Sequence, residues 1–263
     1  MEVIREASKH KKHIYCEKPI SLQVEEVEEA FKVAKENNVV LVCAWNRRFD
    51  PHFSALQKIL QEQRKELGKP MLVSSHNGDH PLPPTSILCQ LGSIFHDLMV
   101  HDIDLDLFYS QQFPTSVFAT GTAFSQELRE AGVFDTGVYV MTFSDGSVAI
   151  CTGRRSSSMG YDQRVEVLTE KGSLLKVNNI PQSSVVLNGC GSDEWPSGYR
   201  YSKINHTFVD RYKEAYSLEV NNLTELLLDA SEPKSNYQEC KSVSLLSDAA
   251  LQSSKSNKVV LFK

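Results

Sequence analysis

IYCEKPISLQVEEVEEAFKVAKENNVVLVCA, residues 14–44, is the stretch that decides the fold. Residues 14–16 predict a short strand. Ser21 is the expected N-cap of a helix whose apolar positions recur at helical spacing to about Lys35. The unbroken apolar run 39–44 is typical of a buried parallel strand. We interpret residues 1–10 as the end of a preceding helix. The resulting order of helix, strand, helix and strand predicts part of a doubly wound α/β sheet.

The pattern changes after residue 45. We predict helices over 51–66, 92–109, 207–230 and 237–254, and strands over 71–75, within 116–187 and at 259–262. Strands grouped between helices favour an α+β unit with a large, mostly antiparallel open sheet. The domain boundary is therefore predicted between residues 45 and 46, with residues 46–263 forming the second domain and its final helix free to pack back on the first.

Composition excludes several classes of protein. The net charge is −5, which is not the basic footprint of a nucleic-acid-binding protein. No apolar stretch has the length of a membrane span, and no secretory signal is visible at the N-terminus. Six cysteines without CxxC spacing predict free thiols in a reducing compartment, and hence a cytoplasmic protein.

Lys18 is the first candidate for chemistry. It directly follows the first strand, and ligands of open α/β sheets lie beyond the carboxyl ends of the strands. A partly desolvated lysine can act as acid, base or oxyanion stabiliser, and Pro19 restricts the backbone beside it, with a cis peptide as one option. From this local context alone, a solvent-facing lysine before a turn is the stronger interpretation.

The segment HDLMVHDID, residues 96–104, is the second candidate. On a regular helix Asp97, His101 and Asp104 lie on one face, four and three positions apart. A carboxylate beside a histidine raises the proton affinity of the imidazole, which suits removal of a hydroxyl proton. A structural ion pair and a metal site are the alternatives. A metal needs a third protein ligand that no spacing clearly supplies, so we predict no metal.

The glycine-rich fingerprint GxGxxG of dinucleotide-binding folds does not occur in this sequence. Gly189-Cys190-Gly191 lies in the strand-rich half and does not open a helix after a strand. These glycines therefore do not predict a pyrophosphate-binding turn.

Several segments together resemble the Gfo/Idh/MocA oxidoreductase family, and within it the inositol 2-dehydrogenase-like members. They are EKP at 17–19, WNRRFDP at 45–51, residues 97–104, GYDQR at 160–164 and RYKEAY at 211–216, in that order. The resemblance covers nearly the whole chain, and the ordered set is more specific than any one motif. It implies a dinucleotide-binding domain, of which residues 1–45 are the C-terminal part, followed by the α+β substrate domain.

The resemblance also implies residue roles. Lys18 matches the family's catalytic lysine, and Asp97 and His101 match its aspartate and histidine. His101 is expected to take the hydroxyl proton, Asp97 to orient His101, and Lys18 to hydrogen-bond the reacting oxygen while hydride passes to NAD or NADP. Further expected contacts are Glu17, Lys18, Pro19 and Arg47 to the cofactor, and Arg47, Asp79, Tyr161 and Tyr216 to a polyol or sugar.

One departure from the family pattern bears on activity. The family begins with a strand, a glycine-rich turn and a helix, whereas this chain begins after them, an offset of roughly 60–90 residues for two or more βα units. The omitted part would supply the pyrophosphate site and the acidic residue that selects NAD or NADP. The expectation is an N-terminally truncated chain that binds NAD(P) poorly and has little activity although its catalytic residues are in place.

Competing functions remain at this point. A dehydrogenase of a hexose, an amino-sugar derivative or a dihydrodiol is the rival within the enzyme class, and a non-catalytic binding or regulatory protein is the rival outside it. A broad apolar sheet face would require a covering partner, because large exposed apolar patches are rare on monomers. Together with the resemblance, this predicts a homodimer or homotetramer formed through the open sheet.

Overall fold

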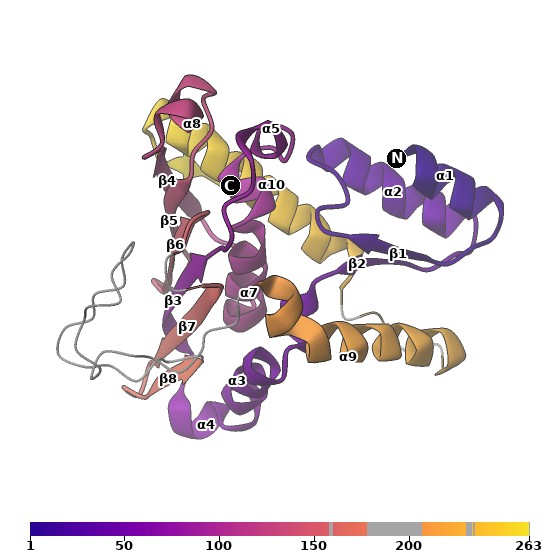
Figure 1. Cartoon of the computed structure of the whole chain (residues 1–263). Coiled ribbons are helices and arrows are strands. Elements are labelled where there is room, and N and C mark those ends of the chain that lie inside the picture. The colour runs from indigo at the N-terminus through magenta and orange to yellow at the C-terminus, as the bar shows by residue number, and fades with distance from the viewer. Residues whose placement is uncertain (158–159, 178–206, 230–232, 234, 263) are drawn as a thin grey trace.

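The computed structural model describes residues 1–157, 160–177, 207–229, 233 and 235–262, and places them around two sheets. A two-stranded sheet lies beside a seven-stranded sheet, and helix α10 runs from one to the other (Figure 1). A shared apolar core joins the two parts: Val27, Cys43 and Trp45 belong to the same buried cluster as Tyr139 and Met141 of the large sheet.

The first part follows the predicted order: α1 (Glu2–Lys9), β1 (Ile14–Glu17), α2 (Val24–Glu36) and β2 (Leu41–Ala44). β1 and β2 are parallel, with Ile14 opposite Leu41 and Glu17 opposite Ala44. Their carboxyl ends therefore meet at one edge, which begins with Lys18. The predicted N-cap was wrong: Gln23 precedes α2, while the Ser21 hydroxyl accepts the Gln23 N–H and donates to Glu26.

The second part is built on the predicted open sheet. Its strands are β3 (Pro70–Gly78), β4 (Ser116–Thr122), β5 (Thr136–Thr142), β6 (Val148–Arg154), β7 (Asp162–Thr169), β8 (Leu174–Val177) and β9 (Val260–Leu261). They lie in the order β8-β7-β3-β6-β5-β4-β9, and only the β3–β6 pair of this described sheet is parallel. The mostly antiparallel sheet that the sequence predicts is thus confirmed.

In the described part of the chain, nine helices accompany the large sheet, and of these α3, α6, α7 and α10 contact its strands. The nine are η1 (Asn46–Phe49), α3 (Pro51–Glu62), α4 (Arg64–Leu67), α5 (Thr85–Leu88), α6 (Ile94–Asp97), α7 (Val100–Ser110), α8 (Gln126–Glu130), α9 (Phe208–Asp229) and α10 (Tyr237–Ser256). α7 contacts β3, α6 contacts β5, and α10 contacts β4, α6, α7 and also α2. α10 therefore contacts both the part that holds the small sheet and the large sheet itself.

Two helices that the sequence predicts as continuous are divided. The helix over 51–66 ends at Glu62, and α4 follows Gln63 as a separate turn. The helix over 92–109 is broken between α6 and α7, where the Leu98 and Met99 N–H groups both bond to the Ile94 carbonyl. Apolar periodicity continued across both breaks because each pair of helices buries the same face, so the sequence pattern did not reveal them.

The other face of the large sheet mixes apolar and charged side chains. Phe118, Val140 and Ile150 lie side by side across β4, β5 and β6 and are half-buried. The row nearer the carboxyl end of β3 is charged instead, because Arg154 and Arg164 both contact the buried Asp162 carboxylate. The predicted apolar face is therefore confined to part of the sheet. No described helix is long and apolar enough to cross a membrane.

Candidate catalytic site

Lys18 lies at the carboxyl edge of β1, between the two parts of the molecule. Its side chain is 16% exposed, and its Nζ donates to the Asp97 carbonyl oxygen at 2.7 Å and lies 3.6 Å from Asp97 Oδ1. The Lys18–Pro19 peptide is cis, one of the two forms the sequence allowed. Burial lowers the pKa of Lys18, and the Arg47 charge adds to this, while Asp97 opposes it. Lys18 is therefore a partly desolvated amine whose protonation is sensitive to its neighbours.

The Asp97 side chain is bound by cations from two different elements. Its Oδ2 accepts a hydrogen bond from Arg155 Nη1 at 2.6 Å, and its Oδ1 faces Lys18. The sequence interpretation omitted Arg155, which follows β6 and has no spacing that relates it to Asp97. Only the fold brings residue 155 to the end of α6.

His101 lies in the first turn of α7. Its ring meets Trp45 edge to face, with ring centroids 6.2 Å apart. Its Nδ1 is buried without a hydrogen-bond partner among the described residues. Burial, together with the positive charges of Lys18 and Arg47, lowers the pKa of His101 well below its ordinary value. The imidazole is thus neutral at physiological pH and able to accept a proton.

The predicted Asp97–His101 hydrogen bond is not present in the described structure. Asp97 bonds to Lys18 and Arg155 instead, and no hydrogen bond joins it to the imidazole. The reason is the break between α6 and α7, which removes the regular helical register on which the pairing depended. The two residues remain near one site, because Lys18 is an electrostatic neighbour of both.

Asp104 is likewise separated from this site. Its carboxylate accepts three hydrogen bonds from Arg48, at 2.7 to 3.1 Å. Arg48 also bonds to Glu239 at the start of α10. Asp104 therefore holds η1, α7 and α10 together and does not extend the Asp97–His101 pair, as the regular helix had predicted.

Arg47 is a buried cation near both Lys18 and His101. It is almost completely buried, and its guanidinium donates to Asp102 Oδ1 at 3.0 Å and to Gln163 Oε1 at 2.6 Å. Asn77 donates to the other Asp102 oxygen at 2.6 Å. Its burial and these bonds favour a supporting role for Arg47 over the direct cofactor or substrate contact that the resemblance implied.

Asp79, Tyr161 and Tyr216 are the three remaining residues predicted to bind substrate. Asp79 follows β3, its electrostatic neighbours include Asp97, Arg155 and Lys18, and burial raises its pKa. Tyr161 is buried and packs edge to face on Tyr212, with ring centroids 5.8 Å apart. Tyr216 on α9 is half-buried, and burial raises its pKa to about 12. The fold thus brings Asp79, the weakest of the sequence candidates, close to Lys18.

Four buried polar atoms without partners among the described residues belong to residues that lie just before Arg47 in the sequence or are its electrostatic neighbours. Trp45 Nε1, Asn46 Oδ1, His101 Nδ1 and Tyr212 OH are buried and make no hydrogen bond within the described ranges. Buried polar groups are ordinarily paired, so this concentration fits a polar ligand that completes them. Parallel strands place dinucleotides at their carboxyl edge, so the residues there, Glu17 to Pro19 among them, fit the nicotinamide end of a cofactor. The described residues contain no cluster of three or more potential metal ligands.

Glu219 on α9 contacts Tyr15 of β1, and its ionisation predicts how the stability of the protein depends on pH. Glu219 is 4% exposed, Tyr15 OH donates to its Oε2 at 2.7 Å, and burial raises its pKa from 4.5 to about 7. Between these pH values the folded protein keeps a proton that the unfolded chain has released, so stability falls as pH rises through this interval.

Glu219→Gln mimics the protonated side chain. We therefore expect it to stabilise the protein by about 2 kcal/mol at pH 8 and to have little effect at pH 4.5. Urea unfolding of both proteins at the two pH values measures this difference. An equal gain at both pH values would contradict the assigned ionisation.

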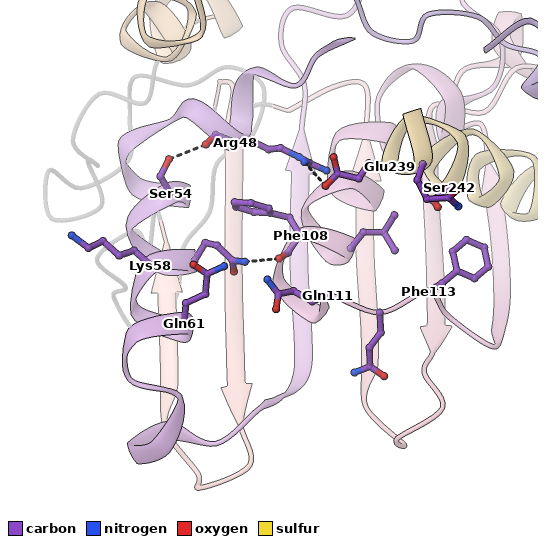
Figure 2. Close-up of a pocket in the computed structure, with 13 residues that line it drawn as sticks. Arg48, Ser54, Lys58, Gln61, Phe108, Gln111, Phe113, Glu239 and Ser242 are labelled. Carbon is purple, nitrogen blue, oxygen red and sulfur yellow. Dashed lines mark hydrogen bonds and ion pairs between the residues drawn. The ribbon is translucent and has the colours of Figure 1, made fainter. Parts of the chain in front are cut away.

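A separate groove of about 660 Å³ lies away from this site, between α3, the end of α7 and the start of α10 (Figure 2). Figure 2 shows Arg48 directed toward Glu239, with Phe108 between them and the α3 side chains. Its lining contains the Arg48–Glu239 ion pair and several glutamines but none of Lys18, Asp97 and His101. The proposed proton-transfer groups therefore lie outside this groove.

Comparison with protein families finds two matches along the chain. Residues 1–45 match the model of an oxidoreductase family with an NAD-binding Rossmann fold. Residues 53–175 match the Gfo/Idh/MocA C-terminal domain. The two matches fall on either side of the boundary predicted at residues 45 and 46.

Individual relatives agree with these matches. An uncharacterized oxidoreductase, YrbE, of Bacillus subtilis is 33% identical over 227 residues, which are 86% of this chain and 64% of that protein. Inositol 2-dehydrogenase of Rhizobium meliloti is 31% identical over 253 residues, which are 96% of this chain and 74% of that protein. The crystal structure of a myo-inositol dehydrogenase from Corynebacterium glutamicum superposes with a TM-score of 0.84 at 28% identity, covering 100% of this chain and 76% of that one. The chain thus spans part of the length of each relative.

Proposed function

This chain belongs to the Gfo/Idh/MocA oxidoreductase family, and on that premise we propose that it carries the catalytic site of an NAD-dependent dehydrogenase that oxidises a secondary hydroxyl of a cyclic polyol to a ketone. The observation that carries the proposal is the convergence of Lys18, Asp97 and His101 at the carboxyl edge of the small sheet. The inositol dehydrogenases among the relatives support inositol as the substrate.

His101 is the proposed base. A hydroxyl proton has to leave as the carbinol carbon loses hydride, and bound NAD supplies the acceptor for that hydride. The imidazole is neutral because burial and two nearby cations disfavour its charged form, so it is ready to receive the proton. The edge-to-face contact with Trp45 holds the ring in place.

Lys18 is proposed to hydrogen-bond the reacting oxygen. Its ammonium has three donors, and the contact with the Asp97 carbonyl uses one of them. A donor beside the oxygen stabilises the negative charge that develops as the proton departs. Asp97 keeps Lys18 in place through its carbonyl and its carboxylate, a role different from the orientation of His101 that the resemblance implied.

The remaining residues are proposed to bind the two ligands. Glu17 and Pro19 flank Lys18 at the strand edge and are proposed to contact the nicotinamide. Asp79 and Tyr216 are proposed to bind substrate hydroxyls, since a polyol offers both donors and acceptors. Tyr161 and Arg47 are buried, so we propose that they support the substrate-binding residues without contacting substrate themselves.

Steady-state assays of the purified protein test the function. We expect slow NADH formation from myo-inositol or scyllo-inositol and still weaker activity with hexoses. Inositol binding followed by calorimetry should weaken in His101→Gln. A protein that neither reduces NAD nor binds any of these polyols would exclude the dehydrogenase and leave a regulatory binding role.

Assembly and location complete the proposal. The apolar row Phe118, Val140 and Ile150 supports self-association through the open sheet, as a homodimer or homotetramer. Light scattering of Val140→Lys against the parent protein measures this. Five free cysteines among the described residues support a reducing, cytoplasmic location.

A further inference from the structure

Arg155 is a fully buried cation with one direct carboxylate partner among the described residues. The residue is 0% exposed, directly follows β6, and its backbone N–H donates to the Asp135 carbonyl at 2.8 Å. Its Nη1 donates to Asp97 Oδ2 at 2.6 Å, while its Nε and Nη2 have no partner in the part of the chain that the structure describes. Because burying an unpaired guanidinium costs several kcal/mol, Arg155 depends on its bond to Asp97 and on the nearby Asp79 charge.

The consequence is that Asp97 is shared between two cations. Arg155 occupies Oδ2, and Lys18 contacts the carbonyl oxygen at 2.7 Å and lies 3.6 Å from Oδ1. Arg155 thereby prevents the carboxylate from turning and forming a close ion pair with Lys18. The Lys18 ammonium keeps donors free for a ligand as a result.

We propose that Arg155 is a positioning residue, which holds the Asp97 carboxylate so that Lys18 stays loosely paired and directed at the reacting oxygen. The proposal rests on the proposed function for its catalytic meaning, but the geometry it assigns can be tested without turnover. Arg155 acts through Asp97 and does not touch the reacting atoms.

Loss of the Arg155 charge should change the pH at which Lys18 loses its proton. Asp97 would then act on Lys18 without competition, and a closer carboxylate favours the charged form of an amine. The midpoint of Lys18 ionisation should therefore move to higher pH. Apart from Asp97, the charged or titratable groups that face Lys18 are Arg47 on η1, Glu17 on β1, His101 on α7 and Asp79 after β3, and none of them is substituted.

Competitive acetylation by acetic anhydride, read by peptide mass spectrometry across pH, measures this midpoint in the full chain. We expect Arg155→Gln to raise the Lys18 midpoint by about one pH unit. Arg154→Gln is the matched control: this neighbouring arginine faces Asp162 on the other side of the sheet and should leave the midpoint unchanged. An unchanged midpoint in folded Arg155→Gln, or an equal shift in Arg154→Gln, overturns the proposal.

If Arg155→Gln does not fold, the variant Arg155→Lys tests whether Arg155 positions Asp97. A lysine retains the charge but carries it on a flexible stem, which fixes the Asp97 carboxylate less firmly than the rigid guanidinium does. We expect a midpoint near that of the parent protein, with kcat lowered at least tenfold and KM little changed. A kcat of Arg155→Lys equal to that of an active parent protein contradicts the positioning role. A Lys18 midpoint raised in Arg155→Lys by as much as we expect for Arg155→Gln contradicts it too. A parent protein that neither reduces NAD nor binds a polyol would contradict the proposed function instead, and the labelling midpoints would still decide on Arg155.

Discussion

Lys18→Met should reduce kcat for polyol oxidation by about 10²- to 10⁴-fold, the range ordinarily lost when a positioned proton-transfer or oxyanion-stabilising group is removed. Methionine keeps much of the length and apolar volume of the lysine stem but has no donor for the reacting oxygen. The Lys18 side chain is 16% exposed, so its ammonium is partly desolvated and its loss should not destabilise the fold.

The measurement is initial-rate NADH formation with saturating NAD, paired with thermal unfolding of each variant. Lys12→Met is the matched control, because Lys12 is exposed and lies in the turn before β1. Full activity in Lys18→Met would remove Lys18 from the catalytic role. Equal losses in both variants would point to a general effect of charge.

Asp102→Asn should cost about 3–5 kcal/mol of unfolding free energy, since it leaves the buried Arg47 guanidinium without its carboxylate. Asp102 is 1% exposed and accepts hydrogen bonds from Arg47 at 3.0 Å and from Asn77 at 2.6 Å. An asparagine at this position has one acceptor oxygen for the two donors and presents its NH₂ group to the other. Substrate turnover should fall with stability, because Arg47 lies beneath Lys18 and His101.

Urea unfolding measures this loss, and two comparisons make it specific. Lys58→Ala breaks the exposed Lys58–Glu62 pair, whose side chains are 71% and 63% exposed, and should change stability by less than about 0.5 kcal/mol. The double variant Arg47→Met/Asp102→Leu removes both charges and should lose less than Asp102→Asn alone. A double variant that is less stable than the single one would show that the ion pair itself is strongly stabilising.

Local sequence patterns were sufficient for most of the elements, whereas Lys18 became the leading candidate only with the ordered set of motifs, because its local context alone favours a solvent-facing lysine. Apolar periodicity predicted α1, β1, α2 and β2, and the position of Lys18 after a parallel strand placed it at the ligand-binding edge. These features depend on neighbours within a few residues, so one sequence contains them. The partners of Asp97 do not, because the bond from Arg155 joins positions 58 residues apart and the helix break before His101 leaves no mark in the periodicity.

The sequence by itself therefore determined the strand–lysine–proline edge, the open sheet and the family resemblance, because each follows from short-range patterning or from the order of motifs. Only the tertiary structure decided which charges meet: Asp97 with Lys18 and Arg155, Asp104 with Arg48, and Asp102 with Arg47. The physical reason is that a buried ion pair is selected by the packing of elements distant in the chain, and a carboxylate on a helix carries no local sign of which cation that packing will bring to it.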